Sequence, residues 1–322
     1  MRNSFVELLR VFFMMGIVII HIYGWGSNLD YDWLYSLGGQ INTAYHLSLY
    51  SLGKLGVTGF IFISGFYGIR MTKKKWLNLI LMCITYYITL CLVHGDYKSL
   101  VHSIHAWDTW WFLSSYFIIC LLAPFIDNAF DNIEEKQIRL LVFGLLFYTY
   151  VGHFMMMNND HDAVLLLSVY IFARYIKTFP PSLITKCNGI LCLVSLTIIT
   201  LCPLLIEQLG GASFHKLQGM FLNNNNPLIL ATVATLVTYA DKHSFNSRII
   251  NNIAASVIAV YLITEWPSIR TSFNTVALPC VLKGYGLLIV PIVTILCVMI
   301  ESLRKILLKK PVDYLSNKYF NE

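Results

Sequence analysis

Ten apolar segments, joined mostly by short polar loops, constrain this chain more than any other feature of its sequence. A helix needs about 20 apolar residues to cross a bilayer. Most of the ten segments approach that length, and the shortest have 14 residues. Because backbone polar groups must be satisfied inside a bilayer, we expect the segments to be helices. They are residues 5–23, 52–69, 76–94, 110–128, 140–157, 163–176, 189–206, 227–240, 250–264 and 283–300.

Composition excludes most soluble enzymes. Of the 322 residues, 57% are hydrophobic and 12% are charged, about half the charged fraction of ordinary soluble domains. The net charge of +6 could indicate nucleic acid or anionic lipid, but in so apolar a chain it favours basic cytoplasmic loops. We therefore expect no nucleic-acid partner. The eight cysteines form no Cys-x-x-Cys pair, so neither zinc nor redox chemistry is expected.

The distribution of Lys and Arg predicts how the chain is threaded. With the N-terminus inside, 17 of the 23 lie on the inner side, five lie outside, and Arg10 is within the first segment. This bias satisfies the positive-inside rule. We predict an all-α, polytopic membrane protein with about ten transmembrane helices, cytoplasmic N- and C-termini, and a single domain over residues 1–322. Its longer outer loops are expected at 24–51, 207–226 and 265–282.

Two ionisable residues lie inside the first apolar segment. Arg10 and His21 are eleven positions apart, which places both on the same face of a helix. The rise between them is roughly 16 Å, so Arg10 lies near the inner boundary and His21 in the outer half. Glu7 precedes Arg10 by one turn and can pair with it. Because ionisable groups at membrane depth are costly, the pair predicts a polar track through the bundle.

Each of these residues also has a purely structural interpretation. Arg10 could reach the inner headgroups as an anchor. His21 could be an interhelical hydrogen-bond donor or an interface residue. Their shared face favours the functional interpretation.

The first segment resembles the opening helix of the acyltransferase-3 family of membrane acyltransferases. The family's signature there is an acidic residue, an Arg three positions later, then ten residues and a His. Glu7, Arg10 and His21 match all three positions. The family has about ten membrane helices and a cytoplasmic N-terminus, as the charge distribution predicts independently.

Three further patches carry the resemblance. Residues 56–70 are similar to the family's second-helix motif, which ends in Ser-Gly-Phe, here beginning at Ser64. Residues 110–130 are similar to its Trp-Phe-Leu helix, which ends in a Pro and a polar exit. Residues 259–270 resemble a Tyr-Leu-Ile-His segment near the family's C-terminal end, with Thr264 where the family usually has His.

The resemblance implies O-acyl transfer by a multi-pass enzyme of the bacterial plasma membrane. The acyl group, usually acetyl, would pass from cytoplasmic acetyl-CoA to a sugar hydroxyl of a surface polysaccharide or its lipid-linked precursor. Acetyl-CoA is then a co-substrate, and no tightly bound cofactor is expected. A sugar hydroxyl needs a base with a pKa near neutral, which imidazole supplies. His21 is that candidate, and an acyl-His intermediate is the alternative.

The remaining candidates follow from the chemistry of the two substrates. The phosphates of coenzyme A need cations on the inner side, whereas sugars stack on aromatic rings and exchange hydrogen bonds with carboxylates. The basic run could instead be a topology anchor, and the aromatics an interfacial belt. We assign catalysis to His21 and Arg10, cofactor binding to Arg10, Arg70, Lys73, Lys74 and Ser64, and substrate binding to Glu7, Trp110, Trp111, Tyr116, Tyr261 and Glu265.

Other polar clusters are interpreted as loops. His102, His105 and Asp108 are assigned to an outer loop helix, and residues 158–162 to a polar turn, so no metal site is expected. Residues 223–226, four asparagines before Pro227, read as a solvated helix start. A competing function is a glycan transporter or flippase with Arg10 and His21 lining its path. Against it, the halves show no clear inverted repeat and no matching pair of broken helices.

Overall fold

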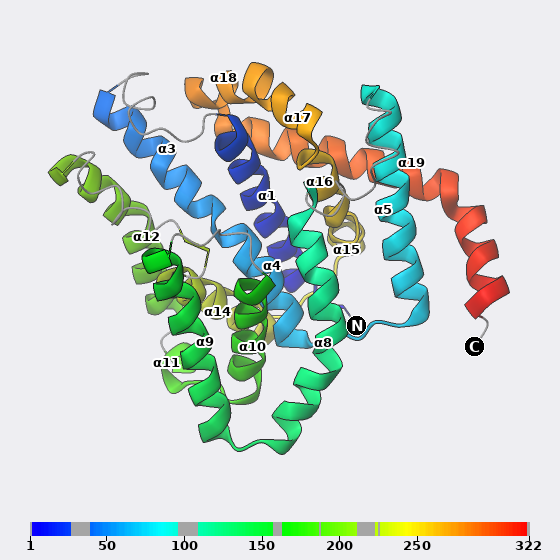
Figure 1. Ribbon diagram of the computed structural model, residues 1–322. Coiled ribbons are helices and arrows are strands. Elements are labelled where there is room, and N and C mark those ends of the chain that lie inside the picture. Colours follow the sequence, from blue (N-terminus) through cyan, green and yellow to red (C-terminus); the bar gives the residue numbers. More distant parts are fainter. Residues whose placement is uncertain are drawn as a thin grey trace.

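The computed structural model describes residues 2–26, 39–95, 109–156, 163–186, 188–210, 223–224 and 226–320. Within these ranges the regular elements are all helical, which confirms the all-α prediction (Figure 1). The elements are α1 (Ser4–Gly26), α3 (Gly39–Gly53), α4 (Leu55–Tyr67), α5 (Lys73–His94), α8 (Trp111–Asn132), α9 (Glu135–Met156), α10 (Ala163–Thr178), α11 (Ser182–Lys186), α12 (Asn188–Gly210), α14 (Pro227–Lys242), α15 (Arg248–Ala254), α16 (Val257–Thr264), α17 (Pro267–Ser272), η2 (Phe273–Ala277), α18 (Leu278–Cys280), η3 (Val281–Tyr285) and α19 (Gly286–Phe320).

Each of the ten apolar segments overlaps one or more of these helices. By length and composition, five helical stretches of the described chain can cross a membrane, and two shorter apolar helices accompany them. The number ten, and the cytoplasmic location of the termini, stay predictions. The five stretches are Ser4–Tyr23, Tyr45–Tyr67, Lys73–His94, Trp111–Asn132 and Pro267–Leu308, and the shorter helices are Asn188–Cys202 and Arg248–Thr264.

Two predicted outer loops are wrong in part, because they contain helices. Helix α3 begins within the expected loop 24–51, ends two residues beyond it at Gly53, and leads almost directly into α4. Its Leu47 and Leu49 are buried, and α3 packs against α1 and α12. Likewise, the expected loop 265–282 is helical from Pro267 onward. In both places apolar side chains spaced among polar ones gain burial by forming a helix.

Glycines bring α4 into very close contact with its neighbours. A Cβ at Gly56 would lie 2.5 Å from the carbonyl oxygen of Phe13 in α1. A Cβ at Gly65, in the Ser-Gly-Phe motif, would collide with the carbonyl oxygen of Tyr170 in α10. Small residues at such points let membrane helices approach closely. The motif's glycine therefore has a packing role in this chain.

We expect Gly65→Ala to destabilise the protein by about 1–3 kcal/mol, the usual cost of overpacking. The added methyl group meets backbone of α10, which cannot move aside without shifting the helix. Gly144→Ala in α9 is the matched control, because a Cβ there meets nothing within 4 Å. Thermal unfolding of both variants in detergent tests this, and equal transition temperatures would contradict it.

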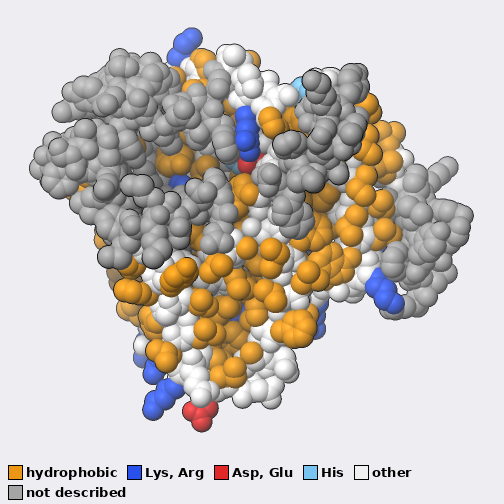
Figure 2. Space-filling model, in the orientation of Figure 1, with side chains coloured by type: hydrophobic (Ala, Val, Ile, Leu, Met, Phe, Trp, Pro, Cys, Tyr) orange, Lys and Arg blue, Asp and Glu red, His pale blue; other side chains and the backbone are white. Residues whose placement is uncertain are grey.

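The outer helices expose apolar side chains over wide areas. Figure 2 shows such side chains gathered on one face of the molecule, with Lys and Arg at its lower edge. Phe125 of α8 is 74% exposed and Leu140 of α9 is 76% exposed. Exposed apolar patches of this kind mark a surface covered by lipid or by a partner, and α8 also has the length and composition of a membrane span.

A proline break positions the candidate site. Pro267 begins α17, and Trp266 before it adopts an extended conformation, as residues that precede proline prefer. Helix α16 therefore ends at Thr264, and Glu265 follows at its C-terminal cap. Both α16 and α17 contact α1. The break thus presents two polar residues to the half of α1 that contains His21.

Candidate active site

His21 contacts the end of α16 through both ring nitrogens. Its Nδ1 lies 2.8 Å from Oγ1 of Thr264, and its Nε2 lies 2.7 Å from Oε2 of Glu265. The side chains of His21 and Glu265 are 6% and 1% exposed, and Thr264 is fully buried. Helices far apart in the sequence therefore meet at one imidazole.

The hydrogen bonds of Thr264 determine which tautomer His21 takes. The Thr264 hydroxyl donates to the carbonyl oxygen of Val260 at 2.7 Å. Its oxygen can then only accept from His21, so Nδ1 carries a proton. The remaining nitrogen, Nε2, is left to exchange a proton with Glu265. Thr264 thus fixes the ring, a role that neighbouring groups commonly have for a functional histidine.

Glu265 is held from its other side by Arg270. The Arg270 Nη2 pairs with Oε1 of Glu265, so the two carboxylate oxygens have different partners. A buried carboxylate is strongly destabilising without a partner, and Arg270 satisfies that need independently of His21. Glu265 therefore has a counter-charge that does not depend on His21.

A small cavity of about 40 Å³ opens beside His21 and Glu265. It exceeds the ~10–15 Å³ that one water requires, so it can hold a group of a few atoms. Thr264 does not line it, so the nitrogen of His21 on the cavity side is Nε2 and not Nδ1. The cavity is lined by Ile17, Ile20, His21, Lys54, Val57, Trp111, Phe112, Asn224, Tyr261 and Glu265.

The predicted aromatic residues divide into two groups. Trp111 and Tyr261 line the cavity, and the Tyr261 ring lies 5.9 Å from that of His21. Trp110 does not line the cavity. Its Nε1 donates to the carbonyl oxygen of Leu262. The Tyr261 hydroxyl also accepts from the backbone N–H of Phe112. These bonds join the start of α8 to α16 and fix the cavity wall.

Sequence reasoning did not select four polar residues at this site, namely Lys54, Asn224, Thr264 and Arg270. Lys54 counted as one of the outer basic residues, yet it is 6% exposed and lines the cavity. Asn224 is 3% exposed, and Asn223 and Asn226 are also buried, so the prediction that this helix start is solvated is wrong for these three residues. The Oδ1 of Asn224 has no hydrogen-bond partner among the described residues. Thr264 could have been selected from the sequence, because it occupies the position where the resembling family usually has His.

Arg10 occupies a second polar site, toward the N-terminal end of α1. Its Nη1 lies 3.1 Å from Oε1 of Glu7, which confirms the expected pairing one turn apart. Glu7 also contacts Arg2. Tyr116 interacts with Ser64 and with Arg10. Three of the predicted residues, namely Glu7, Ser64 and Tyr116, therefore lie on the side of Arg10 and not on that of His21.

No continuous polar track runs along α1 between these two sites. On the face that carries Arg10 and His21, the intervening side chains are Met14 and Ile17, which are 1% and 2% exposed. They occupy the positions four and seven residues after Arg10, where the helical period returns to the same face. The shared face was predicted correctly, but the path between the two residues is packed.

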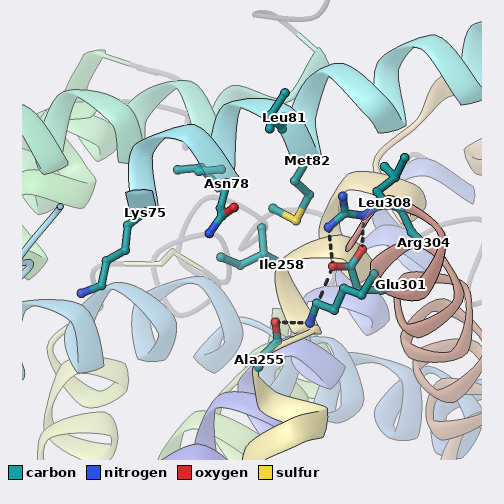
Figure 3. Close-up of a pocket in the computed structure, with 11 residues that line it drawn as sticks. Lys75, Asn78, Leu81, Met82, Ala255, Ile258, Glu301, Arg304 and Leu308 are labelled. Carbon is teal, nitrogen blue, oxygen red and sulfur yellow. Dashed lines mark hydrogen bonds and ion pairs between the residues drawn. The ribbon is translucent and has the colours of Figure 1, made fainter. Parts of the chain in front are cut away.

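The basic run after α4 is exposed. Arg70, Lys73 and Lys74 are all exposed, at the start of α5. Their neighbour Lys75 lines a larger pocket of about 500 Å³ with α15, α16 and α19 (Figure 3). That pocket contains neither Arg10 nor His21.

The described residues contain no cluster of three or more metal-ligating side chains. His102, His105, Asp108 and residues 158–162, which were assigned to loops, lie outside the described ranges.

Comparison with known proteins matches the chain to a protein family. The family model described as an Acyltransferase domain matches residues 3–301, which include all the site residues above. No curated protein and no solved structure matches the chain.

Proposed function

Because the chain belongs to the acyltransferase-3 family, we propose that it is a membrane O-acyltransferase that acetylates a surface glycan. The acyl group, acetyl in the simplest case, would come from acetyl-CoA and go to a sugar hydroxyl of a surface polysaccharide or lipid-linked glycan in a bacterial plasma membrane. The observation that carries this proposal is the buried His21, oriented by Thr264 and Glu265 beside a cavity of reactant size.

The chemistry of the proposed step follows from the contacts of His21. The acceptor hydroxyl enters the cavity and replaces Oε2 of Glu265 at Nε2, while Glu265 keeps Arg270. Nε2 takes the hydroxyl proton as the oxygen attacks the thioester carbonyl. The carbon–sulfur bond then breaks, and the imidazolium returns the proton to the departing thiolate of coenzyme A. Glu265 stabilises the imidazolium that forms. In the acyl-His alternative, Nε2 attacks the thioester carbonyl and expels the thiolate of coenzyme A, and the sugar hydroxyl then attacks the acyl-imidazole, which forms the ester and restores His21.

The Arg10 site is the proposed location of the donor's phosphates. Arg10 is 25% exposed while Glu7 beside it is buried, so part of the guanidinium faces outward from the pair. Arg70, Lys73 and Lys74 add positive charge near the same end of the bundle. The rise between Arg10 and His21 along α1 is roughly 16 Å. Because Met14 and Ile17 pack that face of α1, the pantetheine arm would have to reach His21 beside this face and not along it.

Lys54 is the residue best suited to stabilise charge on the reacting carbonyl oxygen. A cation beside a developing oxyanion in a dry cavity contributes strongly to catalysis. We expect Lys54→Met to lower the turnover rate by about 10²–10³-fold. Lys283→Met, which removes an exposed lysine, should leave turnover unchanged. Initial rates of acetyl transfer at saturating acetyl-CoA measure this, and similar rates for both variants would contradict it.

The function is tested by NMR measurement of O-acetyl groups on surface glycan from cells with and without the protein. We expect the O-acetyl signals to disappear in its absence while the amount of surface glycan is retained. If glycan instead fails to reach the surface while its precursor stays acetylated, the transporter alternative explains the data and the enzyme proposal is wrong.

A further inference from the structure

A pocket larger than the cavity at His21 lies away from it, between α5 and α19, and its lining also includes Ala255 and Ile258 (Figure 3). We propose that it is a binding site for an anionic phospholipid from the leaflet at the N-terminal end of α1. Its volume of about 500 Å³ is in the range of ligand pockets. The pocket is lined by Lys75, Asn78, Leu79, Leu81, Met82, Ala255, Ile258, Glu301, Arg304, Lys305 and Leu308.

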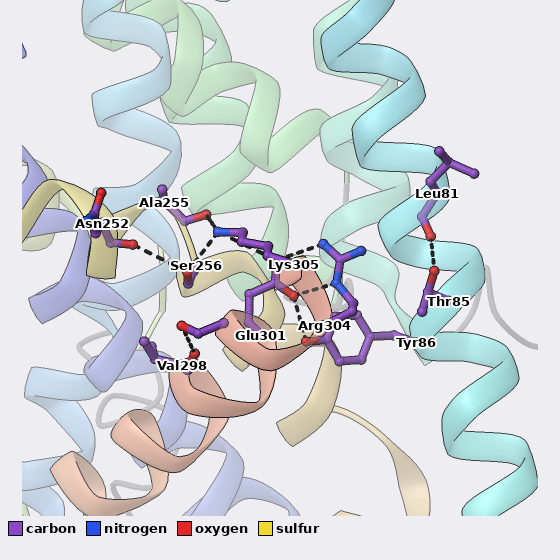
Figure 4. A network of polar contacts seen from close by, with 11 residues as sticks. Leu81, Thr85, Tyr86, Asn252, Ala255, Ser256, Val298, Glu301, Arg304 and Lys305 are labelled. Carbon is purple, nitrogen blue, oxygen red and sulfur yellow. Dashed lines mark hydrogen bonds and ion pairs between the residues drawn. The ribbon is translucent and has the colours of Figure 1, made fainter. Parts of the chain in front are cut away.

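The polar side of the pocket is built around a buried carboxylate. Glu301 is 1% exposed, and it binds Nε and Nη2 of Arg304 at 2.7 and 2.8 Å (Figure 4). The Tyr86 hydroxyl donates to the same carboxylate at 2.8 Å. Lys305 lies 3.7 Å from it and donates to Ala255 and Ser256. The network therefore fixes two cationic side chains at the wall of the pocket.

The lining carries an excess of positive charge. Lys75, Arg304 and Lys305 supply three positive charges and Glu301 supplies one negative charge. The net charge of the lining is therefore +2. Lys75 stands on the opposite side from Arg304 in Figure 3, and its exposed ammonium donates to the carbonyl oxygen of Arg70 at 2.8 Å. Guanidinium and ammonium groups placed around one space suit a phosphate, since Arg offers a fork of donors and Lys a point charge.

The apolar lining and the surroundings favour a lipid over a soluble phosphate. Leu79, Met82 and Ile258 give the pocket an apolar wall next to its cations. On the flanking helices, Ile84 of α5 is 48% exposed and Leu307 of α19 is 68% exposed. Acyl chains would lie against these surfaces while the phosphate meets the cations. Basic pockets between membrane helices commonly recognise anionic headgroups in this way.

Lys75 and Lys74 provide a matched pair for the test. Both are exposed lysines in the first turn of α5, but only Lys75 lines the pocket. The full-length protein in detergent is titrated with dioleoylphosphatidylglycerol, and separately with zwitterionic dioleoylphosphatidylcholine, and binding is read by native mass spectrometry. We expect the unchanged protein to bind phosphatidylglycerol more tightly than phosphatidylcholine. The affinity for phosphatidylglycerol should be about fivefold weaker in Lys75→Gln and the same in Lys74→Gln.

Three results would overturn the proposal. Equal affinities for the two lipids would remove the role of headgroup charge. Equal losses in the two lysine variants would indicate diffuse surface charge. A third titration uses coenzyme A, and Lys75-dependent binding of coenzyme A without that of phosphatidylglycerol would assign the pocket to a soluble phosphate. Helical content and unfolding temperature confirm that the variants are folded, and no readout depends on acyl transfer.

Discussion

Replacement of His21 by Ala is expected to lower acyl transfer by about 10²–10⁴-fold, the usual contribution of a general base. His21 is the group whose Nε2 faces the cavity, and the described lining residues offer no second imidazole. Should the mechanism pass through acyl-His, the loss would be at least as large, because the covalent step would be removed. O-acetyl content of surface glycan and initial rates in membranes are the measurements.

His243→Ala is the matched control for this variant. His243 is an exposed histidine at the end of α14, so the same substitution there should leave transfer unchanged. The His21 variant should reach the membrane at a normal level, because Glu265 keeps its pairing with Arg270. Normal acetylation with a normal level of protein would exclude His21 as base or nucleophile.

The sequence predicted features that depend on local pattern. The helical period put Arg10 and His21 on one face, and the spacing of Glu7 predicted its pairing with Arg10. The apolar segments predicted the helices, because backbone groups in a membrane have few other solutions. Each of these features is determined within a single helix, so the sequence of that helix is enough to predict it.

Features that depend on contacts between helices were not predicted. Lys54 has the same local signal as any outer lysine, and only the packing of α4 beside α1 places it in the cavity. Glu265 was assigned to substrate, but the break at Pro267 turns it toward His21. The packing of Met14 and Ile17 likewise depends on which helices surround α1. Periodicity identifies a face, but not what covers it.

Replacement of Glu265 by Gln is expected to lower acyl transfer at least about 10²-fold, although Gln can still accept from Arg270. The amide nitrogen would donate to Nε2 of His21, which would occupy the lone pair that must take the hydroxyl proton. Gln also cannot stabilise the imidazolium. Glu135→Gln in α9, an exposed carboxylate, is the control and should have normal activity. Initial rates in membranes test this.

The double variant His21→Ala with Glu265→Gln decides what Glu265 does. If Glu265 acts through His21, its substitution has nothing left to affect once the imidazole is gone, so the double variant should be as active as His21→Ala alone. Residues that act as a unit show such non-additivity. If Glu265 instead binds the sugar, as the sequence suggested, the two losses multiply and the Michaelis constant for the acceptor rises in Glu265→Gln. Multiplied losses would therefore show that Glu265 acts independently of His21, and they would assign Glu265 to substrate binding.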